Sequence, residues 1–295
     1  MPEARGSRGS PTVRRRELGT VLRTLRSERG MTVDQVAAEL LCSPSKVSRM
    51  ETGQRGATAR DIRDLCDLYQ VDVSVREHLN RLAAEGKEHG WWRSYDLDFR
   101  AYVEFEEAAV SLKHFATVTV MGLVQTAGYA RAMHLGGFQD FTPERIEELV
   151  EVRMKRQQLL SRQPPLQLHI IFDEAVLRRE VGGPAVMAEQ LNRLIEVAKS
   201  QQIMIQVIPY SVGAHPAMES NFSIFEFDGS ADVVYVEGLA GWLYLDRPGE
   251  LNRYHEVFER LRKKALSPRE SIELIAKIAA LYNSAQDFTG DLSTS

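Results

Sequence analysis

Four polar residues at helical spacing could contact nucleic acid bases. They would lie on the outer face of a short helix that begins after Ser43, and they are Ser45, Lys46, Ser48 and Arg49. An arginine can donate two hydrogen bonds to one guanine, and a helix N-terminus attracts phosphate. A Lys/Arg pair alone would fit an ordinary helical hairpin with a solvated polar face much better than a DNA-binding helix. The helices that position these residues therefore decide between the two interpretations.

Capping residues on both sides of these four positions predict where helices begin and end. Thr32 and Gln35 form a capping box, which predicts the start of a first helix. Ser43 is a second N-cap, and Pro44 occupies the first helical position, where a missing N–H costs nothing. Gly53 is suited to end this second helix in a left-handed conformation. The pattern predicts two helices joined by a tight turn, with the polar residues on the second helix.

Residues 17–55, ELGTVLRTLRSERGMTVDQVAAELLCSPSKVSRMETGQR, resemble the xenobiotic-response-element (Cro/C1-repressor-like) helix-turn-helix family. In that family, the residues matching Ser45, Lys46 and Arg49 face base edges, and Arg55 matches a loop position that meets the DNA backbone. The resemblance implies a DNA-binding domain. The candidate DNA-binding residues are Thr32, Ser43, Ser45, Lys46, Ser48, Arg49 and Arg55, together with Arg14, Arg15 and Arg16.

The same resemblance implies a structural ion pair. The residues matching Arg26 and Glu51 tie the first helix of the family to the recognition helix. Leu41 departs from the pattern, because many members have a glycine at this turn. A left-handed leucine would be strained, so we expect one of the family's variant turns here.

Composition and charge fit a two-domain soluble protein. The chain has 295 residues, 43% of them apolar and 26% charged. Residues 1–60 hold 12 Lys/Arg and 6 Asp/Glu, whereas the remainder holds 25 and 35. A basic module on an acidic body predicts nucleic acid binding at one end only.

The cellular compartment follows from what the sequence lacks. It has no run near the ~20 apolar residues of a membrane span and no signal-peptide pattern. Cys42 and Cys66 show no CxxC spacing, which suits a reducing cytoplasm and gives no zinc signature. We expect a cytoplasmic, nucleoid-associated protein with no metal and no cofactor.

The predicted fold class is an all-α N-terminal helix-turn-helix domain of five helices, followed by an α+β domain with a mostly antiparallel sheet. Residues 1–12 are expected to be a disordered arm, 13–88 the DNA-binding domain, 92–285 a regulatory or interaction domain, and 286–295 a flexible tail. In the first domain, helices are expected near 14–28, 59–69 and 74–86, besides the two already described. In the second, helices are expected over 102–115, 125–133, 143–163, 183–200, 248–264 and 267–281, with the last segment fraying after Tyr282. Strands are expected over 118–123, 166–172, 203–208, 222–227, 233–237 and 242–245, the last three as a meander.

The second domain also resembles a known family. The blocks VMGLVQTAGYARAM, RQQLL, FDEAVLRREVGGPAVMAEQL, VIPYSVGAHPAM and ALSPRESIELI are similar to the C-terminal domain of the actinobacterial WhiJ-like, antitoxin-type regulators. The resemblance covers roughly 92–285. It implies a transcriptional regulator, commonly encoded beside a small partner protein, and it supplies no ligand.

No enzyme motif is present. The sequence lacks GxGxxG, a P-loop, HExxH and GxSxG, and its seven histidines do not pair at metal spacing. Ser211, His215 and Glu219 could be imagined as a catalytic set, but their spacing does not support one. We therefore expect a non-enzymatic protein.

Three functional hypotheses remain. The first is a homodimeric DNA-binding transcriptional regulator, because one helix-turn-helix makes few contacts and a dimer would read two half-sites of an operator. The second is an antitoxin-like interaction module that binds a small partner protein, with DNA binding secondary. The third is a ligand-sensing regulator with a pocket near the aromatic cluster of Trp91, Trp92, Tyr95, Phe99, Tyr102 and Phe105, which would otherwise be core.

Overall fold

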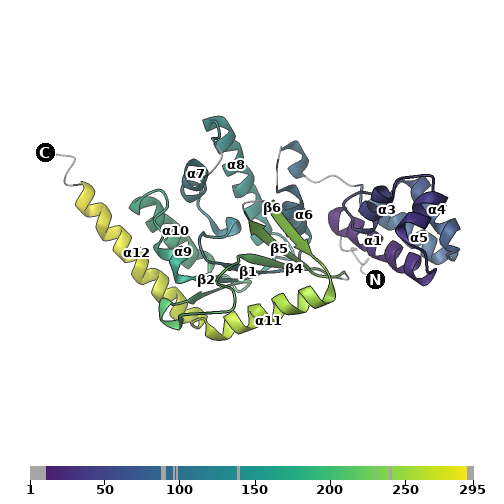
Figure 1. Ribbon diagram of the computed structural model, residues 1–295. Helices are drawn as coiled ribbons and strands as arrows, with labels where there is room; N and C mark the ends of the chain where they lie inside the picture. Colours follow the sequence, from purple (N-terminus) through teal and green to yellow (C-terminus); the bar gives the residue numbers. More distant parts are fainter. Residues whose placement is uncertain are drawn as a thin grey trace, which may run out of the picture. The chain divides into compact units, whose positions relative to one another are not determined.

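A computed structural model describes residues 11–87, 91–95, 97, 99–137, 140–228, 230–238 and 241–290 (Figure 1). The chain divides into two compact units. Unit 1 comprises the residues up to Ala108 together with Asp228–Ala231, and unit 2 comprises Ala109–Phe227 and the chain from Asp232 onward. The described residues between Trp91 and Ala108 belong to unit 1. The predicted domain boundary near residues 88–92 stays a prediction.

Unit 1 is built of helices, as predicted. The region expected to be a disordered arm lies outside the described residues up to residue 10, and the first helix begins at Pro11, three residues earlier than expected. The helices are α1 (Pro11–Glu28), α2 (Val33–Glu39), α3 (Pro44–Glu51), α4 (Ala59–Tyr69), α5 (Val73–Glu85), the 3-10 turn η1 (Trp91–Ser94) and α6 (Arg100–Ala108).

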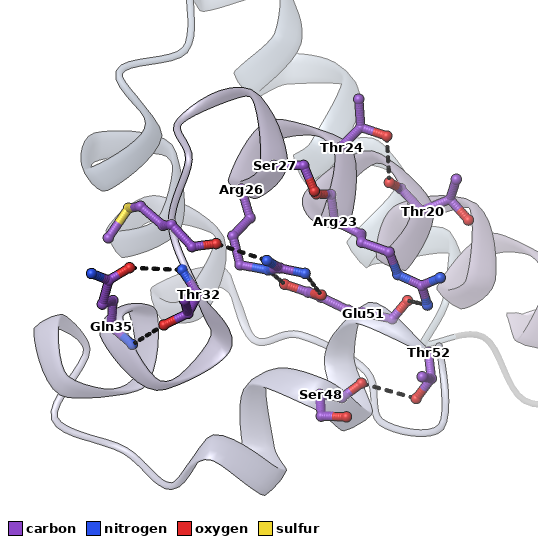
Figure 2. Close-up of polar contacts among 11 residues, drawn as sticks. Thr20, Arg23, Thr24, Arg26, Ser27, Thr32, Gln35, Ser48, Glu51 and Thr52 are labelled. Carbon is purple, nitrogen blue, oxygen red and sulfur yellow. Dashed lines mark hydrogen bonds and ion pairs between the residues drawn. The ribbon is translucent and has the colours of Figure 1, made fainter.

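Side-chain caps fix where these helices begin. Thr32 and Gln35 form the predicted capping box: the Thr32 N–H donates to Gln35 Oε1 at 2.8 Å, and the Gln35 N–H donates to Thr32 Oγ1 at 3.2 Å (Figure 2). Ser43 caps α3 by accepting the Lys46 N–H, and Pro44 follows at the first position. Thr58 and Asp61 form a second capping box at α4. These local bonds satisfy N–H groups that a helix leaves without partners.

The turn between α2 and α3 keeps a left-handed residue. Leu41 has φ +49° and its side chain is 94% exposed. The Cys42 N–H donates to the Ala37 carbonyl at 2.9 Å, and the Leu41 N–H donates to the Ala38 carbonyl at 3.2 Å, which is the Schellman pattern of a helix end. Leucine therefore occupies the position for which glycine is better suited. Gly53, after α3, adopts the expected left-handed conformation with φ +71°.

Unit 2 contains a mixed six-stranded sheet of order β3-β2-β1-β4-β5-β6. Strands β1 to β3 pair in parallel and the other three pairings are antiparallel, which confirms the expected α+β class with a mostly antiparallel sheet. The predicted meander corresponds to β4, β5 and β6. The strands are β1 (Ser111–Ala116), β2 (Gln167–Asp173), β3 (Ile203–Ile208), β4 (Phe222–Glu226), β5 (Val233–Gly238) and β6 (Gly241–Leu245).

One strand was predicted wrongly. The sequence predicted a helix over 102–115 and a strand over 118–123, whereas α6 ends at Ala108 and β1 runs from Ser111 to Ala116. The strand lies between β2 and β4, and the side chains of Leu112 and Phe115 are fully buried. Backbone pairing of β1 with β2 and β4 outweighs the local helical pattern, so tertiary contacts decide the secondary structure of this segment.

In Figure 1, the helix of residues 248–264 runs along the sheet, and the helix of residues 268–290 extends away from it. Phe258 and Leu261 of α11 (Pro248–Lys264) pack on the sheet residues Ile171, Ile224 and Val234. The last helix runs to Gly290, and residues 291–295 lie outside the described part, so the predicted fraying after Tyr282 stays a prediction. The helices are α7 (Ala127–Leu135), α8 (Pro143–Arg156), α9 (Glu174–Arg178), α10 (Pro184–Val197), α11 (Pro248–Lys264) and α12 (Pro268–Gly290), with 3-10 turns η2 (Gly122–Val124), η3 (Gln157–Leu160) and η4 (Tyr210–Val212). Within the described ranges, no helix combines the length and apolar character needed to cross a membrane.

Candidate nucleic-acid interface

Helix α3 has one buried face and one polar, exposed face. Val47 and Met50 are 1% and 2% exposed and belong to the core of unit 1. Ser45, Ser48 and Arg49 are exposed. The helix therefore presents three of the four predicted base-contacting residues on its solvent side, which is the arrangement that a recognition helix requires.

Arg49 is held along its own helix. Its Nε donates a hydrogen bond to the carbonyl oxygen of Ser45, one turn earlier, at 3.2 Å. The guanidinium thus lies beside Ser45 at the N-terminal half of α3. Because one N–H is engaged by the main chain, the orientation of the remaining donors is restricted, which suits a two-bond contact to a base edge.

Lys46 is placed differently from its predicted neighbours. Its Nζ lies 2.5 Å from Oδ1 of Asp61 in α4, and the two side chains are 25% and 9% exposed. The resemblance assigned Lys46 to a base edge, but here its ammonium group forms an internal ion pair. Asp61 was not among the predicted site residues, although Thr58-x-x-Asp61 is the same type of capping pattern as Thr32-x-x-Gln35.

Arg26 and Glu51 form the implied ion pair between α1 and α3 (Figure 2). Nε and Nη2 of Arg26 donate to the two carboxylate oxygens of Glu51 at 2.6 and 3.0 Å. A third donor, Nη1, bonds the carbonyl of Met31 at 2.8 Å, and Arg23 bonds the carbonyl of Glu51 at 3.1 Å. The hydrogen bond to Glu51 raises the pKa of Arg26 against the opposing effect of burial. The pair thereby fixes the C-terminal turn of α3 against α1.

Gly19 permits this close approach, and the sequence analysis did not single it out. A Cβ at Gly19 would lie 2.6 Å from the carbonyl oxygens of both Met50 and Glu51. A glycine inside an otherwise helical pattern was the available signal, since such glycines mark close backbone contacts.

The three arginines near the N-terminus are engaged within unit 1. Arg14 pairs with Glu17 at 2.7 Å and with Glu85 at 2.9 Å. Arg15 pairs with Glu104 at 3.1 Å, and the guanidinium of Arg16 lies 5.3 Å from the centre of the Phe105 ring. These contacts join α1 to α5 and α6, a structural role that the sequence analysis did not foresee for residues predicted to hold phosphates.

The remaining candidates are two helix caps and one loop residue. Thr32, Ser43 and Arg55 are exposed, and the Arg55 N–H donates to the Arg49 carbonyl at 2.9 Å. Thr32 and Ser43 act as helix caps. Arg55 therefore belongs to a loop that is tied to the recognition helix, as a phosphate contact beside α3 would require.

The aromatic segment expected at the domain junction packs within unit 1. Trp92 is buried and its Nε1 donates to Glu104 Oε1 at 3.0 Å. Trp91 makes edge contacts with Trp92 and Tyr95 at centroid distances of 5.9 Å. A buried indole with a satisfied N–H is typical of a packing role.

Potential catalytic or metal-binding residues in unit 2 contact one another or a lysine. His215 Nε2 lies 3.4 Å from Asp173 Oδ2. Glu226, Asp232 and His255 offer ligand atoms within 4.8 Å of one another. In that group His255 bonds Asp232 at 3.0 Å, while Glu226 bonds the ammonium of Lys113 at 2.6 Å.

Comparison with known proteins supports the two-part organisation. Residues 17–79 match a family described as "Helix-turn-helix domain", and residues 99–277 match "Domain of unknown function (DUF5753)". No curated protein matches the chain. Among solved structures, the crystal structure of the clp gene regulator ClgR from C. glutamicum is 23% identical over 26% of this chain and 96% of that one, with a TM-score of 0.21. Since the DUF5753 match spans more than half of the sequence, the chain belongs to the DUF5753 family, and it carries a helix-turn-helix domain ahead of that region.

Proposed function

We propose that the protein is a sequence-specific DNA-binding transcriptional regulator whose helix α3 reads the major groove. The observation that carries this proposal is the exposed face of Ser45, Ser48 and Arg49 on a helix whose opposite face is buried and whose end is clamped by Arg26 and Glu51. A fixed helix with a polar outer face can hold its donors at one depth in the groove.

Arg49 would supply the main base contact. Its guanidinium can donate two hydrogen bonds to O6 and N7 of a guanine, and Ser45 and Ser48 can contact either a base or a phosphate. Arg55 would hold the backbone beside the recognition helix. Arg14, Arg15 and Arg16 receive a structural role in this proposal, because each already contacts a carboxylate or an aromatic ring.

The proposed active form is a homodimer. One helix of this length reaches only a few base pairs, which limits both affinity and discrimination. Two copies related by a two-fold axis would read half-sites about one helical turn, roughly 34 Å, apart.

We propose that unit 2 is the regulatory part, which binds a small partner protein encoded nearby or an effector. Charge alone favours no class of partner, since unit 2 (residues 109–227 and 232–295) is nearly balanced, with 19 Lys/Arg against 22 Asp/Glu. In this proposal the chain is the antitoxin-like member of a two-gene pair. A complex that forms with the neighbouring gene's product and changes DNA affinity would support the assignment.

Selection of bound duplexes from a random library tests the DNA-reading proposal. The wild-type protein is expected to enrich a two-fold motif with a guanine at one position of each half-site. The Arg49→Ala variant is expected to lose preference at that position, with discrimination lower by about 1–3 kcal/mol. Arg63→Ala provides the matched control, because Arg63 is exposed on α4 and lies outside the proposed contact face. No enriched motif for the wild-type protein would contradict the proposal.

A further inference from the structure

The ion pair between Lys46 and Asp61 joins two helix N-termini. Lys46 is the third residue of α3, and Asp61 is the third residue of α4. Their Nζ and Oδ1 atoms are 2.5 Å apart, and only 9% of the Asp61 side chain is exposed. The contact therefore lies at the N-terminal end of the recognition helix, the end that approaches the bases in a helix-turn-helix.

Asp61 has further bonds that fix it in place. Its Oδ2 accepts hydrogen bonds from the Thr58 N–H at 2.9 Å and from the Thr58 hydroxyl at 2.8 Å. Burial would raise the pKa of this carboxyl, but the bonds from Lys46 and Thr58 outweigh burial and lower its pKa. The carboxylate is thus an ionised, rigid anchor whose remaining strong partner is the Lys46 ammonium.

We infer that Lys46 is a positioning residue, which holds the start of α3 against the start of α4, and that base discrimination at α3 rests on Ser45, Ser48 and Arg49. The inference rests on the proposed DNA-reading function. It assigns to Lys46 a different role from the base contact that the family resemblance implied.

The reason is the cost of breaking the pair. If Lys46 turned toward DNA, a nearly buried carboxylate would lose its charged partner, and an uncompensated buried charge is strongly unfavourable. The Lys46 ammonium would also leave a short, charge-assisted bond. Ser45, Ser48 and Arg49 carry no such penalty, since they already face solvent.

Hydrogen exchange on the full-length protein tests the positioning role without DNA. The variants are Lys46→Gln, Asp61→Asn and the double variant, with Arg63→Gln as a control on the exposed face of α4. Both single variants are expected to speed amide exchange in peptides covering 43–62, and the double variant is expected to add little, because the two residues act as a pair. Peptides from unit 2 should be unchanged. Independent, additive effects of the two substitutions would overturn the inference.

DNA binding gives a second test with opposite predicted signs. Asp61→Asn releases Lys46 from its ion pair. If Lys46 contacted DNA, the variant would bind the enriched duplex more tightly, and the slope of log affinity against log salt concentration would steepen by about 0.9. If Lys46 only positions α3, Asp61→Asn instead lowers the ratio of affinity for the enriched duplex to affinity for random DNA by roughly threefold to tenfold. Lys46→Gln should lower the same ratio while leaving the salt slope and the preferred base at every position unchanged.

The two arms separate failure of this inference from failure of the proposed function. If the wild-type protein shows no preference for any duplex, the DNA-reading function fails, and the exchange measurement still reports whether Lys46 and Asp61 act as a pair. If the wild-type protein is specific and Lys46→Gln loses preference at a single base position, the function stands and the positioning role is wrong.

Discussion

Arg26 and Glu51 lie 25 residues apart in the chain and meet through two parallel hydrogen bonds of 2.6 and 3.0 Å. Their side chains are 16% and 6% exposed. Paired guanidinium and carboxylate groups of this geometry fix both distance and orientation. The pair therefore fixes the end of α3 against α1, and this also fixes the position of the exposed residues of α3.

Replacing Arg26 with methionine should destabilise unit 1 by about 3 kcal/mol, because the nearly buried Glu51 carboxylate loses its charged partner. Arg76→Met is the matched control, since the Arg76–Asp67 pair lies in the same unit with side chains 36% and 61% exposed, and its loss should cost under about 1 kcal/mol. Urea unfolding of the three proteins measures the difference. Equal losses for the two variants would contradict the structural role of the Arg26–Glu51 pair.

Gly19→Ala should destabilise unit 1 although alanine favours helix. The added methyl would lie 2.6 Å from two carbonyl oxygens of α3, and the backbone must shift to relieve the overlap. Overpacking costs about 1–3 kcal/mol, which exceeds the gain of about 1 kcal/mol in helix propensity. Thr20→Ala, at the next and exposed position of α1, gains helix propensity without any overlap and should stabilise unit 1 slightly. A more stable Gly19→Ala protein would show that α1 and α3 are not in close contact.

Leu41→Gly should stabilise the turn between α2 and α3. A left-handed residue with a Cβ costs roughly 1–2 kcal/mol, and glycine removes that strain at an entropic cost of about 0.5–1 kcal/mol. The side chain is 94% exposed, so little packing is lost. The expected net gain is about 0.5–1 kcal/mol by thermal or urea unfolding. Leu41→Ala keeps the Cβ and should give no such gain; if it stabilises equally, strain is not the cause.

Unit 2 should lose stability as the pH falls from about 6.5 to about 4. Burial lowers the pKa of His114 from 6.5 to about 4, and desolvation lowers the pKa of His134 to about 4 as well. Below pH 6.5 the unfolded chain takes up protons that the folded chain does not, so the free energy of unfolding decreases with falling pH. Urea unfolding at several pH values measures this slope. In His114→Gln the slope should be shallower, and an unchanged slope would rule out His114 as a source.

Local signals in the sequence predicted the helix-turn-helix part of the fold. Thr32, Ser43 and Pro44 act on N–H groups within three residues, so their pattern alone marks where α2 and α3 begin. Long-range pairing explains the misplaced strand. Ser111–Ala116 becomes a strand because β2 and β4, over 50 and 100 residues away, pair with it on both sides.

The candidate site shows the same division between local and distant effects. The exposed face of Ser45, Ser48 and Arg49 follows from helical spacing and was predicted. Lys46 pairs with Asp61 of α4, 15 residues away, and Arg15 pairs with Glu104 of α6, 89 residues away. Arg14 pairs with Glu85 of α5 as well as with Glu17 of its own helix, and Arg16 contacts the Phe105 ring of α6. The resemblance suggested a DNA contact for Lys46, and charge suggested one for Arg14, Arg15 and Arg16. The tertiary structure shows the carboxylates and the aromatic ring that engage these side chains.

Fluorescence anisotropy of the full-length protein tests the central claim most directly. Binding to the DNA upstream of its own gene would be compared with scrambled DNA of equal length over a series of salt concentrations. The account predicts tighter binding to the upstream DNA with a steep loss of affinity as salt increases. Equal, weak binding to both duplexes at every salt concentration would contradict a regulator that reads its own promoter through α3.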